Sequence, residues 1–370
     1  MLFIKFISGE EIMKNRKIIS ASVPCFLILL CTSVFAVTPI IESEKNNQYI
    51  VREFIRKGKA IYPVGLDEDK LASIQKEQWD KPPYKIWFYD ASGEIYHSCS
   101  AEGLVLEKDV YNGELYTLEA DVTPNYITRK TRAISEGKHS GDFIEAVDLY
   151  IRKYAPAQND GINILKIENP DKPFDDFRKS VQVLVILNNQ ARILDYNPHY
   201  DHPEKRNFKL ITYELNGSGK PISSLKIPVQ QPVPSYNSHD DNYLYFNNSI
   251  GSSPEGRICQ FIRIDMETGN KEILIEGTGK FTGFSKYKND KIVKTHGFFD
   301  SRKNGFVQFF DIIDLKEPDN VIDRVTYSSL ISSTPVRMDW DKELEKFIAS
   351  KPGRDKEGNF FKVFYTLERK

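Results

Sequence analysis

The sequence predicts an all-β protein made of small repeated sheets, and three observations support this prediction. The aromatic residues are mainly Tyr (19) and Phe (23), with only 3 Trp, and such residues together with β-branched ones favour strands. Apolar runs are short and are bounded by Gly, Pro, Asn and Asp, which is typical of strands joined by turns. One arrangement of strand, acidic residue, turn and strand also recurs. Its clearest copy is FIRIDMETGNKEILIE at residues 261–276.

The recurring arrangement has the period of a propeller blade. The acidic residues that mark its six copies are Asp90, Glu168, Glu214, Asp265, Asp314 and Glu368. Their spacings are about 78, 46, 51, 49 and 54 residues, and four of these five are close to the ~40–50 residues of one four-stranded blade. We therefore expect a six-bladed β-propeller over residues 48–370. Two tandem β-sandwich domains are the alternative.

The one long spacing predicts a helical insertion at residues 126–160. Residues 142–154, DFIEAVDLYIRKY, place Phe143, Val147 and Ile151 four positions apart, on one face of a helix. Acidic residues at its start favour a capping box. A second, shorter surface helix is expected at residues 67–79.

The two ends of the chain predict how the ring of blades closes. The last copy ends directly after its VFYTL strand and lacks an outer strand, whereas the apolar run at residues 49–55 belongs to no copy. An open ring would expose two sheet edges, which are prone to aggregation. We expect residues 49–55 to pair with the last blade.

The words IWFYDASGEI at residues 86–95 and FIRIDMETGN at residues 261–270 resemble the strand–turn–strand units of TolB-like exported six-bladed propellers. The chain departs from that class in lacking Asp-Gly pairs in these words and in the expected insertion. The resemblance implies a periplasmic or secreted binding module. It carries over no catalytic residue.

The N-terminus predicts export. The basic residues Lys14, Arg16 and Lys17, an apolar run at residues 18–30 and small residues at Val34 and Ala36 are typical of a signal peptide over residues 1–36. Met13 is the alternative start of translation. The alternative is an uncleaved membrane anchor, because residues 18–37 are long enough to span a bilayer. Residues 37–47 are expected to be loose. Either way, we expect a periplasmic or secreted protein.

Charge and cysteine content narrow the classes of partner. The formal charge is −1, and removal of residues 1–36 brings it to about −3, which excludes the basic surface of a nucleic-acid-binding protein. The mature chain keeps Cys99 and Cys259. An oxidising compartment permits a disulfide between them, and two buried free thiols are the alternative.

The best candidate metal ligands lie in two polar segments with imidazole and carboxylate groups, which suit zinc or manganese. They are His199, Asp201, His202, His239 and Asp240. Solvated polar loops are the competing interpretation. Calcium could instead be held by carboxylates such as Asp339 and Asp341, although no EF-hand spacing is present.

No nucleophile elbow or phosphate-binding loop is present, and the SIGSS segment at residues 249–253 is interpreted as a turn. We therefore expect a binding or scaffolding module that needs no cofactor, with another protein or a cell-envelope component as its partner. The alternative is a propeller hydrolase or lyase, for which a divalent metal is the candidate cofactor.

Overall fold

The structure is a computed structural model that describes residues 40–43, 49–54, 59–67, 70–78, 81–90, 94–134, 137–156, 158–168, 181–197, 207–227, 234–279, 282–301, 305–329, 337–354 and 360–369. Residues Ile41–Lys370 form one compact unit. The expected signal peptide, including Met13, lies outside the described residues. Within the residues that the structure describes, no helix is long and apolar enough to cross a membrane.

The described strands form six antiparallel sheets, five of four strands and one of five. Blade 1 is β3 (Lys59–Asp67), β4 (Lys70–Gln78), β5 (Lys81–Tyr89) and β6 (Ile95–Ala101). Blade 2 is β7 (Leu104–Tyr111), β8 (Glu114–Ile134), β9 (Gly137–Tyr154) and β10 (Ile162–Glu168). Blade 3 is β11 (Val181–Leu187), β12 (Gln190–Asn197), β13 (Asn207–Glu214) and β14 (Pro221–Ile227).

The second half of the chain continues the pattern. Blade 4 is β15 (Ser235–His239), β16 (Tyr243–Ser253), β17 (Gly256–Asp265) and β18 (Lys271–Gly279). Blade 5 is β19 (Gly283–Lys286), β20 (Lys291–Asp300), β21 (Gly305–Asp314) and β22 (Glu317–Ser329), with β1 (Ile40–Ser43) beside β22. Blade 6 is β23 (Arg337–Asp341), β24 (Lys346–Arg354) and β25 (Phe360–Arg369), completed by β2 (Tyr49–Phe54).

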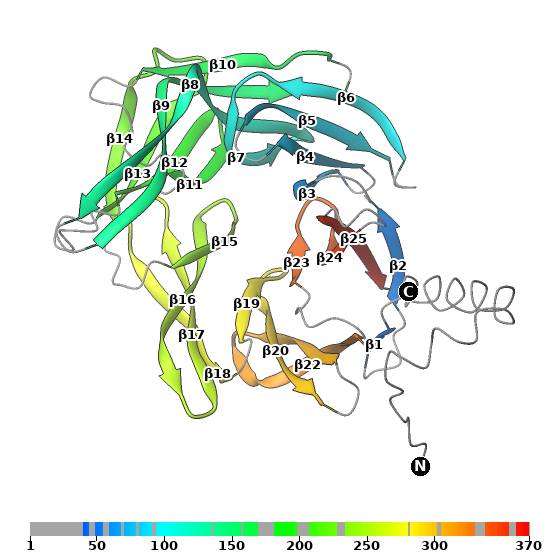
Figure 1. The fold of residues 1–370 in the computed structure, drawn as a ribbon. Helices are drawn as coiled ribbons and strands as arrows, with labels where there is room; N and C mark the ends of the chain where they lie inside the picture. Colours follow the sequence, from blue (N-terminus) through cyan, green and yellow to red (C-terminus); the bar gives the residue numbers. More distant parts are fainter. Residues whose placement is uncertain are drawn as a thin grey trace, which may run out of the picture. The chain divides into compact units, whose positions relative to one another are not determined.

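The sheets succeed one another around a common centre, as in a β-propeller (Figure 1). The first strand of each blade lies innermost, and β3, β7, β11, β15, β19 and β23 contact one another in that order. The last blade contacts the first through β25 and β3. The expectation of an all-β propeller is therefore confirmed, and the alternative of two tandem β-sandwich domains is wrong.

The N-terminal strand β2 supplies the outer strand of blade 6, as the sequence predicts. It pairs antiparallel with β25, from Tyr49 opposite Arg369 to Phe54 opposite Phe364. One blade is thus built from both ends of the described chain, which protects an edge that would otherwise be open. Ile40–Ser43, inside the segment expected to be loose, forms β1.

The predicted helical insertion at residues 126–160 is wrong. The extra residues lengthen β8 and β9 into a long hairpin that turns between Ile134 and Gly137. The fourfold apolar spacing was misleading because β9 is also compatible with period two: Leu149 and Ile151 are buried, whereas Tyr150 between them is partly exposed.

Three smaller expectations also need correction. The helix expected at residues 67–79 is strand β4, whose residues 71–74 are all buried, so its apolar spacing reflects burial on both faces. The SIGSS segment belongs to β16, and the chain reverses after Ser253. Glu168 ends an outer strand, β10, whereas Asp90, Glu214, Asp265 and Asp314 mark the turn after the third strand of their blades.

Polar side chains join neighbouring blades at the inner strands. An inner strand is the edge of its sheet, so backbone groups on one of its sides need partners from outside the blade. Asn247 of blade 4 accepts from Phe284 N at 2.8 Å and donates to Phe284 O at 2.7 Å in blade 5. Asp109 of blade 2 likewise accepts from Ile186 N of blade 3 at 2.7 Å.

Blade 2 also contains a buried ionic cluster. Glu119 is fully buried and accepts from Arg152 at 2.5 Å, Tyr154 at 2.7 Å, Thr117 at 2.6 Å and the backbone of Gly103 at 2.8 Å. Every oxygen of this carboxylate has a partner, which is the condition for burying a charge. The cluster therefore has a structural role.

Cys99 and Cys259 are both buried free thiols, on β6 of blade 1 and β17 of blade 4. Burial raises the pKa of the Cys99 thiol to about 11, so it stays protonated at neutral pH.

Candidate functional site

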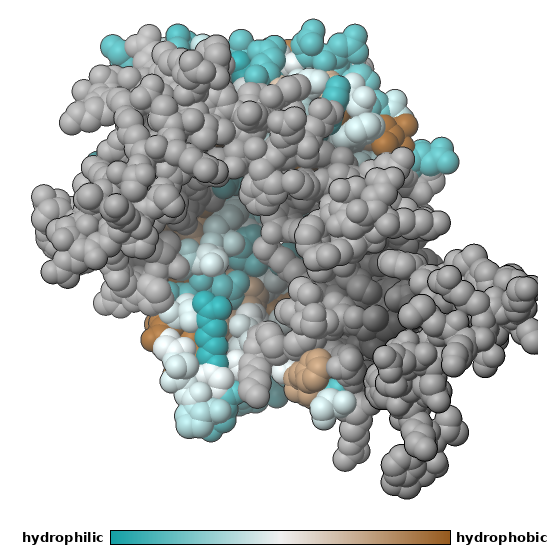
Figure 2. Space-filling view, viewed as in Figure 1, coloured by the Kyte–Doolittle hydropathy of each residue, from teal (hydrophilic) through white to brown (hydrophobic). Residues whose placement is uncertain are grey.

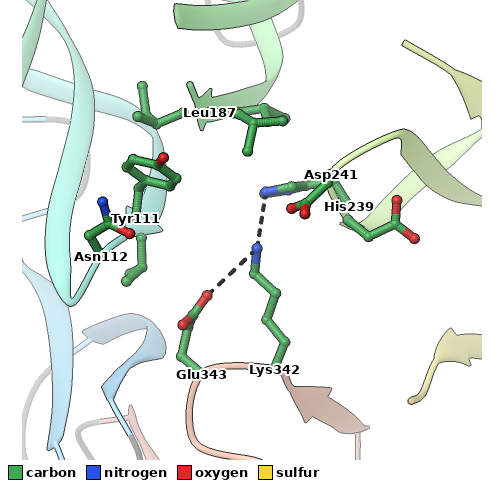
Figure 3. A pocket seen from close by; sticks show the side chains of 11 residues that line it. Tyr111, Asn112, Leu187, His239, Asp241, Lys342 and Glu343 are labelled. Carbon is green, nitrogen blue, oxygen red and sulfur yellow. Dashed lines mark hydrogen bonds and ion pairs between the residues drawn. The ribbon is translucent and has the colours of Figure 1, made fainter. Parts of the chain in front are cut away.

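A polar pocket of about 220 Å³ lies where the carboxyl ends of four inner strands meet. Its walls come from the last residues of β7, β11 and β15 and from the turns that follow β7, β15 and β23, in blades 2, 3, 4 and 6. Figure 3 shows Tyr111, Asn112 and Leu187 facing His239 and Asp241 across it, with Lys342 and Glu343 reaching in from a third side. The propeller thus brings together segments up to about 230 residues apart in sequence.

Tight turns hold two of these walls in place. Asn112 and Gly113 have φ values of 52° and 72°, and Asn188 and Asn189 have 50° and 60°. Positive φ at both central residues defines a type I′ hairpin turn, for which Asn and Gly are the favoured residues. These turns fix Tyr111 and Leu187, the last residues of β7 and β11, at the rim of the pocket.

Aspartates hold the other two walls. Asp240 accepts from the backbone N–H groups of Asn242 at 3.0 Å and Tyr243 at 2.9 Å, and from Tyr245 Oη at 2.6 Å. Asp341 caps its own turn and also accepts from Gly65 N of blade 1 at 2.8 Å. These carboxylates shape turns, because an Asp side chain that accepts from the next backbone N–H groups stabilises the reversal.

His239 lies at the back of the pocket with a side chain that is only 9% exposed. Its Nδ1 is 2.7 Å from Tyr236 Oη, and its Nε2 is 3.4 Å from Lys342 Nζ and 3.5 Å from Asp109 Oδ1. Lys342 can only donate, so Nε2 accepts and Nδ1 carries the proton, which it donates to Tyr236.

Burial controls the charge of this group of side chains. Burial, and secondarily the Lys342 cation, lowers the pKa of the His239 imidazole to about 3, so the ring is neutral at pH 7. Burial raises the pKa of the Asp109 carboxyl to about 7, against the opposing effects of Lys342 and the Ile186 N–H. Because the imidazole is neutral at pH 7, the contact between Asp109 and His239 is not an ordinary salt bridge.

The charged side chains of the pocket that are partly exposed to solvent include Lys342 and Glu343. Their side chains are 47% and 30% exposed, and Lys342 Nζ lies 3.6 Å from Glu343 Oε1. Burial is the main cause that raises the pKa of the Glu343 carboxyl. A lysine held between a carboxylate and a neutral imidazole can donate to a ligand without leaving either partner.

The structure brings together only part of the predicted metal site. His239 and Asp240 are adjacent, but Asp240 is occupied by its turn and both ring nitrogens of His239 have partners. His199, Asp201 and His202 lie outside the described residues, so the metal site stays a prediction. Within the described part of the chain, no group of three or more His, Cys, Asp or Glu side chains is placed to hold a metal ion.

Sequence reasoning missed Asp109, Tyr111 and Lys342. Glu107, Asp109 and Tyr111 alternate along β7, and acidic residues at alternate positions of an inner strand are a recognisable signal once the blade boundaries are known. Lys342 directly follows β23, the inner strand of blade 6. The recurring sequence pattern marks the turn after the third strand of a blade and therefore did not point to this position.

The described part of the outer surface has no extended apolar area on the face seen in Figure 2, where brown residues occur in small separate groups. Exposed large apolar residues such as Phe298, Phe299 and Ile273 are dispersed over blades 4 and 5. The pocket is therefore the more specific feature for a ligand.

Comparisons with known proteins find distant structural similarities and no family for the chain. No protein-family model and no curated protein matches the chain. Among solved structures, it is similar to a protein of unknown function from Dyadobacter fermentans, with 10% identity, a TM-score of 0.46, and coverage of 88% of this chain and 99% of that one.

Two further similar structures are those of named proteins. A variant of Synechocystis apocarotenoid oxygenase matches at 9% identity and TM-score 0.43, over 74% of this chain and 63% of that one. TolB from Acinetobacter baumannii matches at 13% identity and TM-score 0.37, over 74% and 55%. The chain spans less than two thirds of both proteins, and at these scores neither likeness carries a functional argument. The sheet topology defines the class, a β-propeller.

Proposed function

We propose that the chain is an exported binding module whose ligand enters the pocket at the carboxyl ends of the inner strands. The observation that supports this proposal is the convergence of segments at the carboxyl ends of four inner strands, from blades 2, 3, 4 and 6, on one polar cavity. Loops held on a rigid frame are where proteins place recognition residues. The ligand comes from the cell envelope, as a free small molecule or as part of an envelope component.

The size of the pocket limits the ligand. A volume of about 220 Å³ is below the ~300–1,000 Å³ typical of pockets for drug-sized molecules. The ligand, or the part of it that enters, is therefore small. The polar walls favour a hydrogen-bonding group over an apolar one.

Retention of small molecules tests the proposal. The mature protein is equilibrated with a low-molecular-mass extract of its own envelope, separated by gel filtration, and its bound molecules are identified by mass spectrometry. We expect one compound at near-stoichiometric amount, lost in Lys342→Met and kept in Lys226→Met, which alters an exposed lysine on β14. Equal retention by both variants, or none by wild type, contradicts the binding function. Sequencing of the native N-terminus, expected at Val37, tests export.

A hydrolase or lyase is the second candidate, and one observation favours it. A buried carboxyl with a pKa of about 7, Asp109, lies beside a neutral imidazole, His239, as in sites that move protons near neutral pH. Turnover of chromogenic glycosides or esters that is lost in Asp109→Asn, with or without added zinc or manganese, would favour this candidate.

A further inference from the structure

The pocket wall alternates hydrogen-bond donors and acceptors. Lys342 only donates, Glu343 and Asp241 only accept when ionised, and Asn112 and Tyr111 do both. These five side chains come from three different blades and point into one cavity (Figure 3). A ligand that fits this wall must itself both donate and accept at several neighbouring atoms.

The charges on the wall compensate one another only in part. Lys342 Nζ lies between Glu343 Oε1 at 3.6 Å and His239 Nε2 at 3.4 Å, and the carboxylates outnumber the ammonium group. An anion would have to detach Lys342 from Glu343 and lie near Asp241. A cation would have to displace or approach Lys342. Both costs are absent for a neutral ligand, because hydroxyl groups add to an existing ion pair without breaking it.

The wall also has an apolar part. The Tyr111 ring and the Leu187 side chain lie next to each other and opposite His239 and Asp241 (Figure 3). The Tyr111 ring lies beside planar amide and carboxylate groups. Such a wall suits a ligand ring that has C–H groups on its face and hydroxyl groups around its edge. The faces of such a ring pack on tyrosine, and its adjacent hydroxyls each offer one donor and acceptors.

We infer that the pocket binds one neutral hydroxylated ring, that is, a single monosaccharide unit. This inference rests on the proposed binding function and specifies its ligand class. The unit packs on Tyr111, and its hydroxyls donate to Glu343 and Asp241 and accept from Lys342 and Asn112. The unit is either a free sugar or the end of a longer envelope glycan, since the pocket has room for one unit only.

Ligand-observed NMR and calorimetry with three classes of probe test the inference. The probes are neutral methyl glycosides and N-acetylhexosamines, zwitterionic amino acids, and inorganic phosphate. We expect binding from the first class alone. Tyr111→Ala and Glu343→Gln should each weaken it by about 10-fold, because each removes one strong contact. The control Glu267→Gln, which changes a carboxylate that is 82% exposed on blade 4, should leave it unchanged.

The outcomes separate this inference from the proposed function. Binding of an amino acid or phosphate that Lys342→Met abolishes would overturn the monosaccharide and keep the binding function. Sugar binding that is unchanged in both pocket variants would place the sugar elsewhere and overturn the inference. If no probe binds but the envelope extract still yields a compound lost in Lys342→Met, the ligand is not a monosaccharide, and the pocket is still the binding site. If neither binds, both proposals fail. A free sugar and a glycan end are distinguished by comparing methyl glycosides with oligosaccharides of the same terminal unit.

Discussion

Replacement of Asn247 by alanine tests how the blades are held together. The side-chain amide of Asn247 in blade 4 bonds both backbone groups of Phe284 in blade 5, at 2.7 and 2.8 Å. Phe284 belongs to β19, the inner edge strand of its sheet, and is itself buried. In Asn247→Ala both backbone groups lose these partners in a place where water is largely excluded.

The expected loss follows from those two bonds. Each contributes about 1 kcal/mol net, and a buried group left without a partner costs about 1–3 kcal/mol. We therefore expect Asn247→Ala to lower the free energy of unfolding by about 2–3 kcal/mol. Urea unfolding followed by fluorescence and circular dichroism measures this as a lower midpoint with an unchanged m-value.

A matched control makes the result specific. Asn320 is exposed on blade 5 and donates only to Glu317 at 3.1 Å, so Asn320→Ala should change stability by less than about 0.5 kcal/mol. If the two variants unfold at the same urea concentration, side-chain bonds between blades do not hold the ring, and our account of the inner strands is wrong.

Three further predictions concern closure, pH and the buried ion pair. Val51 and Leu367 are opposite each other in β2 and β25. The double variant Val51→Cys/Leu367→Cys should therefore form a disulfide on mild oxidation, which peptide mapping detects. If the two introduced thiols stay free after oxidation, the predicted closure of the ring by β2 is wrong. The pKa of His239 is lower in the folded protein, so the contribution of His239 to stability is full above the unfolded pKa of about 6.5 and is lost as pH falls toward the folded pKa of about 3. His239→Gln should therefore lack about 2 kcal/mol of destabilisation between pH 6.5 and 4.5 relative to wild type, and parallel pH profiles would contradict this. Glu119→Gln should destabilise by about 3 kcal/mol because it removes the buried carboxylate beside Arg152 and leaves that guanidinium paired with Glu102, which is 54% exposed. A change below about 1 kcal/mol on chemical unfolding would show that the pair is dispensable.

The sequence predicted the fold class well because blade turns have strong local signals. The copies ending at Glu214, Asp265 and Asp314 each include a third strand and its turn, and their even spacing gave the blade number. The pairing of residues 49–54 with the last blade also followed, because an incomplete last copy needs an outer strand.

The insertion was misjudged because local pattern was weaker than tertiary context. The segment at residues 142–154 satisfies a helical and a strand period equally, and pairing with β8 decides between them. The alignment on Glu168 failed for the same reason, since the long hairpin moved the true third-strand turn to the residues after Tyr154.

The pocket could be anticipated only in part. His239 and Asp240 were singled out for their chemistry, whereas Lys342 is about 100 residues away and reaches His239 only through the circular arrangement of blades. One-dimensional spacing does not encode which inner-strand ends meet. That information comes from blade order and register.

Hydrogen–deuterium exchange with and without the retained envelope ligand tests the central claim most directly. Our account predicts that one ligand slows exchange together in the pocket-lining segments of blades 2, 3, 4 and 6, at Asn112, Leu187, Asp241 and Lys342, and leaves the outer strands β14 and β18 unchanged. Slower exchange at the outer strands with no change in these four segments would contradict it.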